Sequence, residues 1–100
     1  MKDYVLEVID KTGKKTHLSK ERWNHIRKKH PEIEDIELIE QTIKNPDKIV
    51  QYPFDENIYY FYKYFKNMEP PKQYLLVIIK YLNGEGFIIT AYLEKDIKSM

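Results

Sequence analysis

The hydrophobic pattern of the chain changes close to Pro46. Between about Leu18 and this residue, apolar side chains recur at three- and four-residue steps, which is the spacing of an amphipathic helix. After it, apolar and polar residues alternate in short runs separated by turn residues, which is typical of strands. The pattern therefore predicts one α+β domain of 100 residues, with helices in its first half and an antiparallel sheet in its second half.

The first helix is predicted from about Lys20 to Lys29. Ser19 is a favourable N-cap, and Leu18 and Trp23 have the spacing of a hydrophobic staple. The helix has to end before Pro31, because a proline disfavours helical geometry in the residue that precedes it.

The second helix is predicted to close at Asn45-Pro46. A short strand over Tyr4 to Ile9 and a brief return strand over Lys14 to His17 precede both helices. The prediction of the second helix is based on four isoleucines at helical steps, namely Ile33, Ile36, Ile39 and Ile43.

Four later segments are predicted as strands of one sheet. They run over Lys48 to Tyr52, Ile58 to Phe65, Gln73 to Leu82, and Gly86 to Leu93. Because short connections join consecutive strands, we expect an antiparallel four-stranded meander with the N-terminal helices packed on one face. The apolar stripes predict that the core includes Trp23, Ile26, Ile36, Ile39, Ile43, Phe87 and Ile89.

The charge of the chain limits how it could bind a nucleic acid. The chain carries 17 Lys and Arg against 16 Asp and Glu, so its net charge of +1 provides no global basic field, and a nucleic-acid partner needs a local patch. The first predicted helix is basic and the second is acidic.

Without cysteine there is no disulfide framework, thiolate nucleophile or cysteine-bound zinc. The N-terminal residues lack the order of a signal peptide and no apolar run reaches membrane-spanning length, so we expect a cytoplasmic protein without a membrane partner.

The last predicted strand carries two hydroxyl side chains on one side. Thr90 and Tyr92 alternate with apolar residues and should point away from the helices. Lys80 ends an apolar run in the preceding strand. A two-residue Asn83-Gly84 loop pairs Lys80 with Phe87, whereas a three-residue loop with a glycine bulge places it on the side of Thr90, and the sequence allows both. A structural explanation also exists, since Thr and Tyr are good strand formers and lysine protects a sheet against edge pairing.

Two histidines are candidates for proton transfer. His30 falls on the core-facing stripe at the end of the first predicted helix, and His25 falls on a basic stripe with Arg22 and Lys29. Their structural alternatives are a hydrogen-bonded helix-terminal histidine and a solvated surface histidine, respectively. We expect no metal or other cofactor, because the two histidines are five residues apart and no Cys or paired carboxylate stands at ligand spacing.

The segment from Ile58 to Lys66 is rich in tyrosine and interleaved with lysine. Alternation puts Tyr60, Tyr62 and Tyr64 on one face, where rings could hold unpaired bases while lysines meet phosphate. The alternative is a half-buried strand built of β-forming aromatic residues. His, Lys, Thr and Tyr are also the groups that RNA transesterification requires: a base for the 2′-hydroxyl, an acid for the leaving oxygen, and a cation with hydroxyl donors for the phosphorane.

Three short motifs resemble one known group of nucleases. They are Leu18-Ser19-Lys20-Glu21-Arg22-Trp23-Asn24-His25-Ile26, His30-Pro31-Glu32 and Gly86-Phe87-Ile88-Ile89-Thr90-Ala91-Tyr92-Leu93. The chain is similar, over roughly Thr16 to Lys98, to the small phage- and plasmid-associated nuclease domains of the barnase-EndoU-colicin-RelE superfamily.

The resemblance implies a metal-independent ribonuclease of toxin type with its active site on the open face of the sheet. RNA is then the expected partner, and an antitoxin protein is a candidate second partner. The near-neutral charge favours free or structured RNA over mRNA on the ribosome. The resemblance marks as catalytic His25, His30, Lys80, Thr90 and Tyr92, and it adds Arg22 as a substrate contact. The basic stripe and the tyrosine strand add Lys29, Tyr60 and Tyr62 as substrate contacts.

Two other function classes remain open on the sequence. In the first, the same fold is a non-catalytic RNA- or protein-binding module whose histidines are structural, and RNA that is bound but left intact favours it. In the second, the acidic helix binds a basic protein, and the chain is an antitoxin partner or phage accessory protein. Stable association with a basic partner, without RNA affinity, favours the second class.

Overall fold

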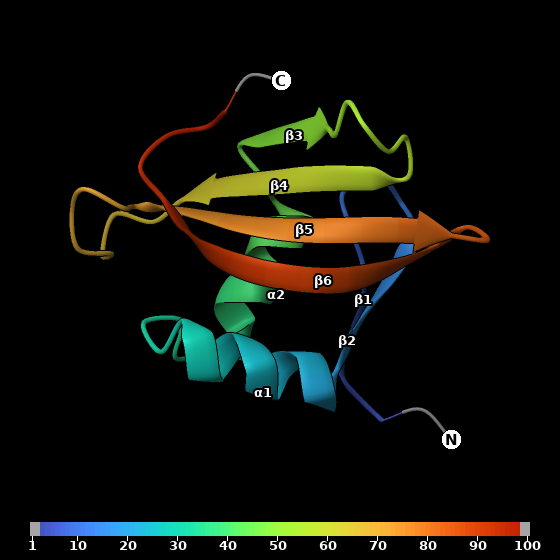
Figure 1. Cartoon of the computed structure of the whole chain (residues 1–100), viewed down its shortest axis with the longest axis horizontal. Coiled ribbons are helices and arrows are strands. Elements are labelled where there is room, and N and C mark those ends of the chain that lie inside the picture. Colours follow the sequence, from blue (N-terminus) through green and yellow to red (C-terminus); the bar gives the residue numbers. More distant parts are fainter. Residues whose placement is uncertain (1–2, 99–100) are drawn as a thin grey trace.

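Six strands in one sheet and two helices make up the computed structural model, which describes residues 3–98 (Figure 1). In chain order the elements are β1 (Tyr4–Ile9), β2 (Lys15–Ser19), α1 (Lys20–Lys29), α2 (Ile36–Lys44), β3 (Lys48–Gln51), β4 (Ile58–Tyr64), β5 (Tyr74–Leu82) and β6 (Glu85–Glu94). Both helices lie between β2 and β3, and the α+β class is confirmed. Within residues 3–98 no helix is long and apolar enough to cross a bilayer.

The sheet has the strand order β1-β2-β6-β5-β4-β3, so the predicted four-stranded antiparallel meander with N-terminal helices was wrong. The early β1–β2 hairpin joins the sheet because β2 pairs in parallel with the edge of β6 that the meander leaves unpaired. The paired residues are Thr16 with Gly86 and His17 with Phe87. Gly86 permits this approach, because a Cβ there would clash with the Thr16 hydroxyl oxygen.

Local signals set the helix boundaries. Ser19 caps α1 by accepting a hydrogen bond from the backbone N–H of Arg22 at 3.1 Å, and the predicted span of this helix is confirmed. Asp35 caps α2 by accepting from the N–H of Glu37 at 2.9 Å, so α2 begins later than its isoleucine stripe suggests. Ile33 precedes the helix but is fully buried.

A β-bulge in β6 changes which side chains face the helices. Ile78 pairs with Thr90 and Ile79 pairs with Ile88, so Ile89 is an extra residue on β6. The strand therefore shifts its alternation by one residue at this point. Ile88 belongs to the core beneath the helices, whereas Ile89 packs in a cluster on the opposite face.

The bulge decides one alternative that the sequence left open and corrects one prediction about the last strand. Phe87 pairs with Lys80 across a two-residue Asn83-Gly84 turn, whose φ angles are 54° and 81°. Lys80 nevertheless shares a face with Thr90, because the bulge brings Phe87 and Thr90 to the same side of β6. The prediction that Phe87 and Ile89 belong to the core beneath the helices was wrong for the same reason.

The main core lies between the helices and the sheet. The predicted core residues Ile26, Ile39 and Ile43 have no exposed surface. Trp23 and Ile36 are partly buried and pack against this core. α1 packs on β1, β2 and β6, and α2 packs on β1, β4 and β5, so within residues 3–98 no helix covers the other face of the sheet (Figure 1).

A buried carboxylate ties the β1–β2 turn to β5. Asp10 is 4% exposed and accepts hydrogen bonds from the Thr12 N–H at 2.8 Å, the Thr16 hydroxyl at 2.7 Å and the Tyr81 hydroxyl. Burial by itself raises the pKa of Asp10, but the hydrogen bonds from Thr12, Tyr81 and Thr16 outweigh burial and lower the pKa below its ordinary value. The charged carboxylate is thus the form that the fold stabilises.

Asp10→Asn should lower the free energy of unfolding by about 1 to 3 kcal/mol at neutral pH, because the amide presents a donor to groups that are themselves donors. The stability from a depressed carboxyl pKa is present above the ordinary value of 3.8 and is lost as the pH falls through the folded-state pKa. Urea unfolding should therefore show a difference that shrinks below about pH 4. Asp96→Asn, at an exposed position, is the control. A difference that stays constant with pH would contradict this account.

Candidate active site

The face of the sheet that turns away from α2, here called the open face, carries most of the predicted site residues. Thr90 lies in one cross-strand row with Ile78 and Tyr60. Tyr92 lies two residues further along β6, and Lys80 lies two residues further along β5 in the opposite direction. Two residues of a strand span about 6 to 7 Å, so Thr90 lies between Tyr92 and Lys80.

α1 forms one border of the open face. The Arg22 guanidinium donates to the backbone carbonyl of Ile89 at 3.4 Å, and the His30 ring lies 5.6 Å from the Tyr92 ring between centroids. The helix therefore runs alongside β6 in the same direction (Figure 1). His25 lies on α1 between Arg22 and His30, its side chain is exposed, and it lines neither of the two clefts that contain other predicted residues.

His30 and Tyr92 line a cleft of about 360 Å³, here called the Tyr92 cleft, whose far wall is the β4–β5 loop at residues 68–72. Glu32 Oε1 lies 3.7 Å from His30 Nδ1. Burial, followed by the charges of Glu94, Tyr60 and Tyr62, raises the pKa of Tyr92. Tyr92 is therefore a hydroxyl donor at neutral pH.

Lys80 and Arg22 line a second cleft of about 280 Å³, here called the Lys80 cleft. Lys80 Nζ lies 3.5 Å from Asp55 Oδ2. Four of the predicted residues thus line two clefts on either side of Thr90, His30 and Tyr92 in one and the two cations in the other, while His25, Lys29, Tyr60 and Tyr62 line neither. Within residues 3–98 no three His, Asp or Glu side chains lie close enough together to hold a metal ion.

A family model described as phage-Barnase-EndoU-ColicinE5/D-RelE like nuclease 2 matches residues 2–100. The chain belongs to this nuclease family. The resemblance read from its short motifs is thereby confirmed, and the open face bordered by α1 is the candidate active site of a nuclease. No curated protein and no solved structure matches the chain.

The tyrosine strand of the nuclease is only partly accessible. Tyr60 is partly exposed, and its ring stacks on Tyr52 at 5.6 Å and 6°. Tyr62, predicted as a substrate contact, has no exposed surface. The segment after β6 folds back over this end of the open face, and Ile97 packs against the cluster that contains Tyr62 (Figure 1). A single apolar residue after a strand gives no pattern from which this cover could be predicted.

His17 received no role from the sequence, yet it lines the Lys80 cleft of the nuclease. It is 5% exposed and stacks between Tyr4 and Phe87, with ring centroids 4.5 and 5.2 Å away. Its Nδ1 lies 2.9 Å from Glu7 Oε2, and its Nε2 contacts the Glu85 carboxylate. The parallel β2–β6 pairing creates this position, and the strand pattern did not reveal that pairing.

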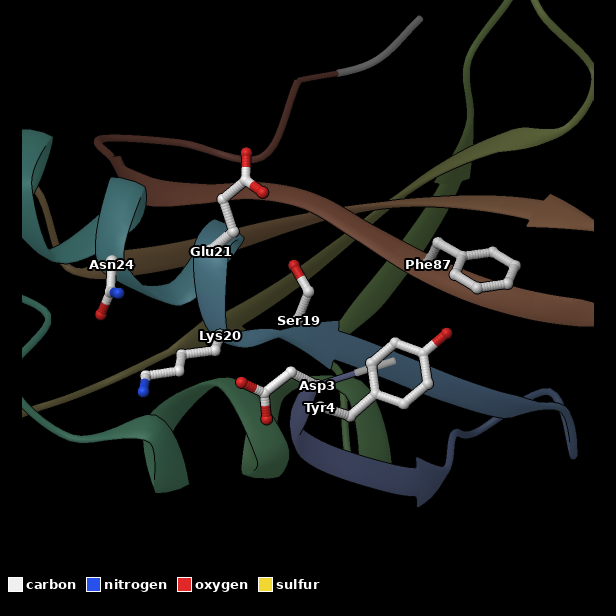
Figure 2. A pocket seen from close by; sticks show the side chains of 7 residues that line it. All are labelled: Asp3, Tyr4, Ser19, Lys20, Glu21, Asn24 and Phe87. Carbon is white, nitrogen blue, oxygen red and sulfur yellow. The ribbon is translucent and has the colours of Figure 1, made fainter. Parts of the chain in front are cut away.

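The most spacious of these hollows, about 610 Å³, lies at the start of α1 (Figure 2). The rings of Tyr4 and Phe87 form one side, while Asp3, Lys20 and Asn24 lie toward the other. None of the predicted site residues lines it. Its two carboxylates, Asp3 and Glu21, accompany one lysine, so its charge does not favour a phosphate.

Proposed function

We propose that this nuclease cleaves RNA by attack of a 2′-hydroxyl on the adjacent phosphate, without a metal ion. The observation that carries the proposal is the arrangement on the open face, where Thr90 lies between the His30–Tyr92 pair and the cations Arg22 and Lys80. These groups supply proton transfer, hydroxyl donation and positive charge, which together suffice for this reaction.

In the proposed reaction the scissile phosphate lies over Thr90. His30 takes the proton of the 2′-hydroxyl, and the 2′-oxygen forms a bond to phosphorus. The bond from phosphorus to the 5′-oxygen breaks, and His25, on the helix that borders the open face, gives that oxygen a proton. Tyr92, Thr90, Arg22 and Lys80 donate hydrogen bonds to the phosphorane oxygens. The products are a 2′,3′-cyclic phosphate and a free 5′-hydroxyl.

Residues in and around the open face are proposed to contact the substrate. Lys29 shares the exposed stripe of α1 with Arg22 and His25, and we assign it to a neighbouring phosphate. Tyr60 remains a proposed base contact, whereas Tyr62 is left out because it is buried. With a net charge of +1, the chain fits free or structured RNA better than ribosome-bound mRNA.

A toxin role and an antitoxin partner belong to the same proposal. A ribonuclease whose active site is exposed can cleave the RNA of the cell that makes it. Such a cell would need an antitoxin protein that covers the open face. The test is induced expression, where growth arrest by the wild type and normal growth with His30→Ala support this role.

A substrate with hydrogen in place of the scissile 2′-hydroxyl should resist cleavage, because the attacking oxygen is missing. The measurement is gel analysis of an end-labelled oligonucleotide that carries one deoxynucleotide at the cut position, and the same replacement one nucleotide away is the control. EDTA should leave the rate unchanged. Cleavage of the deoxy substrate, or loss of activity with EDTA, would exclude this mechanism, and RNA that is bound but intact would favour the non-catalytic binding module.

A further inference from the structure

A row of three aromatic rings leads from the candidate active site to the β3 edge of the open face. Tyr60 shares a cross-strand row with Thr90. Tyr52 stacks on Tyr60 with nearly parallel rings, at 5.6 Å and 6°. Phe54 meets Tyr52 edge-on at 5.6 Å and 69°, and Phe54 is 85% exposed. The row, defined as Tyr60, Tyr52 and Phe54, thus begins two strands away from Thr90, across Ile78, and ends at an exposed phenylalanine.

The loop that carries Phe54 is held in place from both sides. Asp55 accepts a hydrogen bond from the N–H of Asn57 at 2.9 Å and pairs with Lys80 at 3.5 Å. The Gln51 side chain donates to the Glu56 carbonyl at 3.0 Å. Phe54 is therefore presented by an ordered turn, and the lysine that anchors this turn also lines the Lys80 cleft.

Two lysines on the open face indicate what the row binds, and the acidic groups near it are Asp55, which pairs with Lys80, and Glu94, whose charge acts on Tyr60. Lys48 and Lys80 lie on the same face of the sheet as Tyr60. Aromatic rings with neighbouring lysines are the combination that holds single-stranded nucleic acid, since the rings stack on bases while the lysines meet the backbone. Paired bases are already stacked within a duplex and cannot be laid on side chains in this way.

We propose that the row binds unpaired bases of single-stranded RNA next to the scissile phosphate. This inference rests on the proposed function and deepens it by naming the substrate class. Stacking is tolerant of base identity, so the nuclease selects unpaired RNA rather than a fixed sequence at these positions.

The test uses a fluorescently labelled octamer of 2′-O-methyl RNA, which keeps its bases but has no free 2′-hydroxyl to attack. Fluorescence anisotropy should show that Phe54→Ala raises Kd by about 5- to 150-fold, the loss expected for one base stack. Phe54→Trp should bind as the wild type does. The matched control is Ile9→Ala, which removes another exposed apolar side chain, 58% exposed, on the distant strand β1.

A second ligand separates stacking from other effects. In an octamer with abasic spacers the phosphates remain but the bases are absent, so Phe54→Ala should no longer change Kd. Equal binding of the octamer by Phe54→Ala and the wild type, a penalty that persists on the abasic ligand, or a wild type that prefers a peptide or duplex RNA would overturn the inference.

The two proposals fail in different ways. Cleavage by the wild type with no effect of Phe54→Ala on octamer binding leaves the ribonuclease mechanism in place and removes the aromatic row. Octamer binding that depends on Phe54, in a protein that does not cleave RNA, supports the row and removes the mechanism.

Discussion

His30→Ala is expected to lower kcat/KM for RNA cleavage by about 10²- to 10⁴-fold, the range for loss of a general acid or base. His30 lines the Tyr92 cleft, and its ring lies 5.6 Å from Tyr92 between centroids. Among the described residues no other histidine lines this cleft. The measurement is the initial rate with a fluorogenic oligonucleotide, together with a circular dichroism spectrum that shows the variant is folded.

Substitutions of residues near His30 test which side chains transfer protons in the proposed reaction. His25→Ala should produce a loss of similar size if it protonates the leaving oxygen near Thr90. Tyr92→Phe keeps the ring beside His30 but removes the donor, so it should cost less than His30→Ala. Lys28→Ala, at an exposed position of α1, is the matched control. A His30→Ala variant with near wild-type kcat/KM would show that His30 is the hydrogen-bonded helix-terminal histidine that the sequence also allowed.

Local structure could be predicted from the sequence because its causes are local. The cap at Ser19 and the proline after His30 define α1, and the change from helical to alternating periodicity near Pro46 separates α2 from the later strands. Strand pairing is different, because it depends on which edges meet in space. The pattern predicted a strand at Tyr4–Ile9 but could not show that β2 would pair in parallel with β6, and this pairing enlarged the sheet to six strands.

In the candidate site, too, some positions follow from local patterns and others depend on contacts between distant segments. Thr90 and Tyr92 could be placed on one face from alternation alone, since no irregularity separates them. Lys80 could not, because its relation to Thr90 depends on the bulge at Ile89 rather than on the length of the hairpin turn. The burial of Tyr62 depends on the segment after β6, which carries no periodic pattern.

Ile39→Ala is expected to lower the free energy of unfolding by about 2 to 5 kcal/mol, which is a large share of the stability of a small domain. Ile39 has no exposed surface and belongs to the core between α2 and the sheet. Removing three carbons there leaves a cavity that the rigid sheet cannot fill, so the cavity adds to the loss of buried apolar area.

Urea unfolding measures this loss, and Gln41→Ala, at an exposed position of the same helix, should change stability far less. A loss below about half a kcal/mol would mean that the packing around Ile39 is not that of a close-packed core. Ile39 lies on the face of the sheet opposite Thr90 and Tyr92. The variant should therefore keep the wild-type kcat/KM at temperatures where it remains folded, whereas His30→Ala should lose activity and keep its stability. This opposite behaviour separates the residues that hold the fold from those proposed to act on RNA.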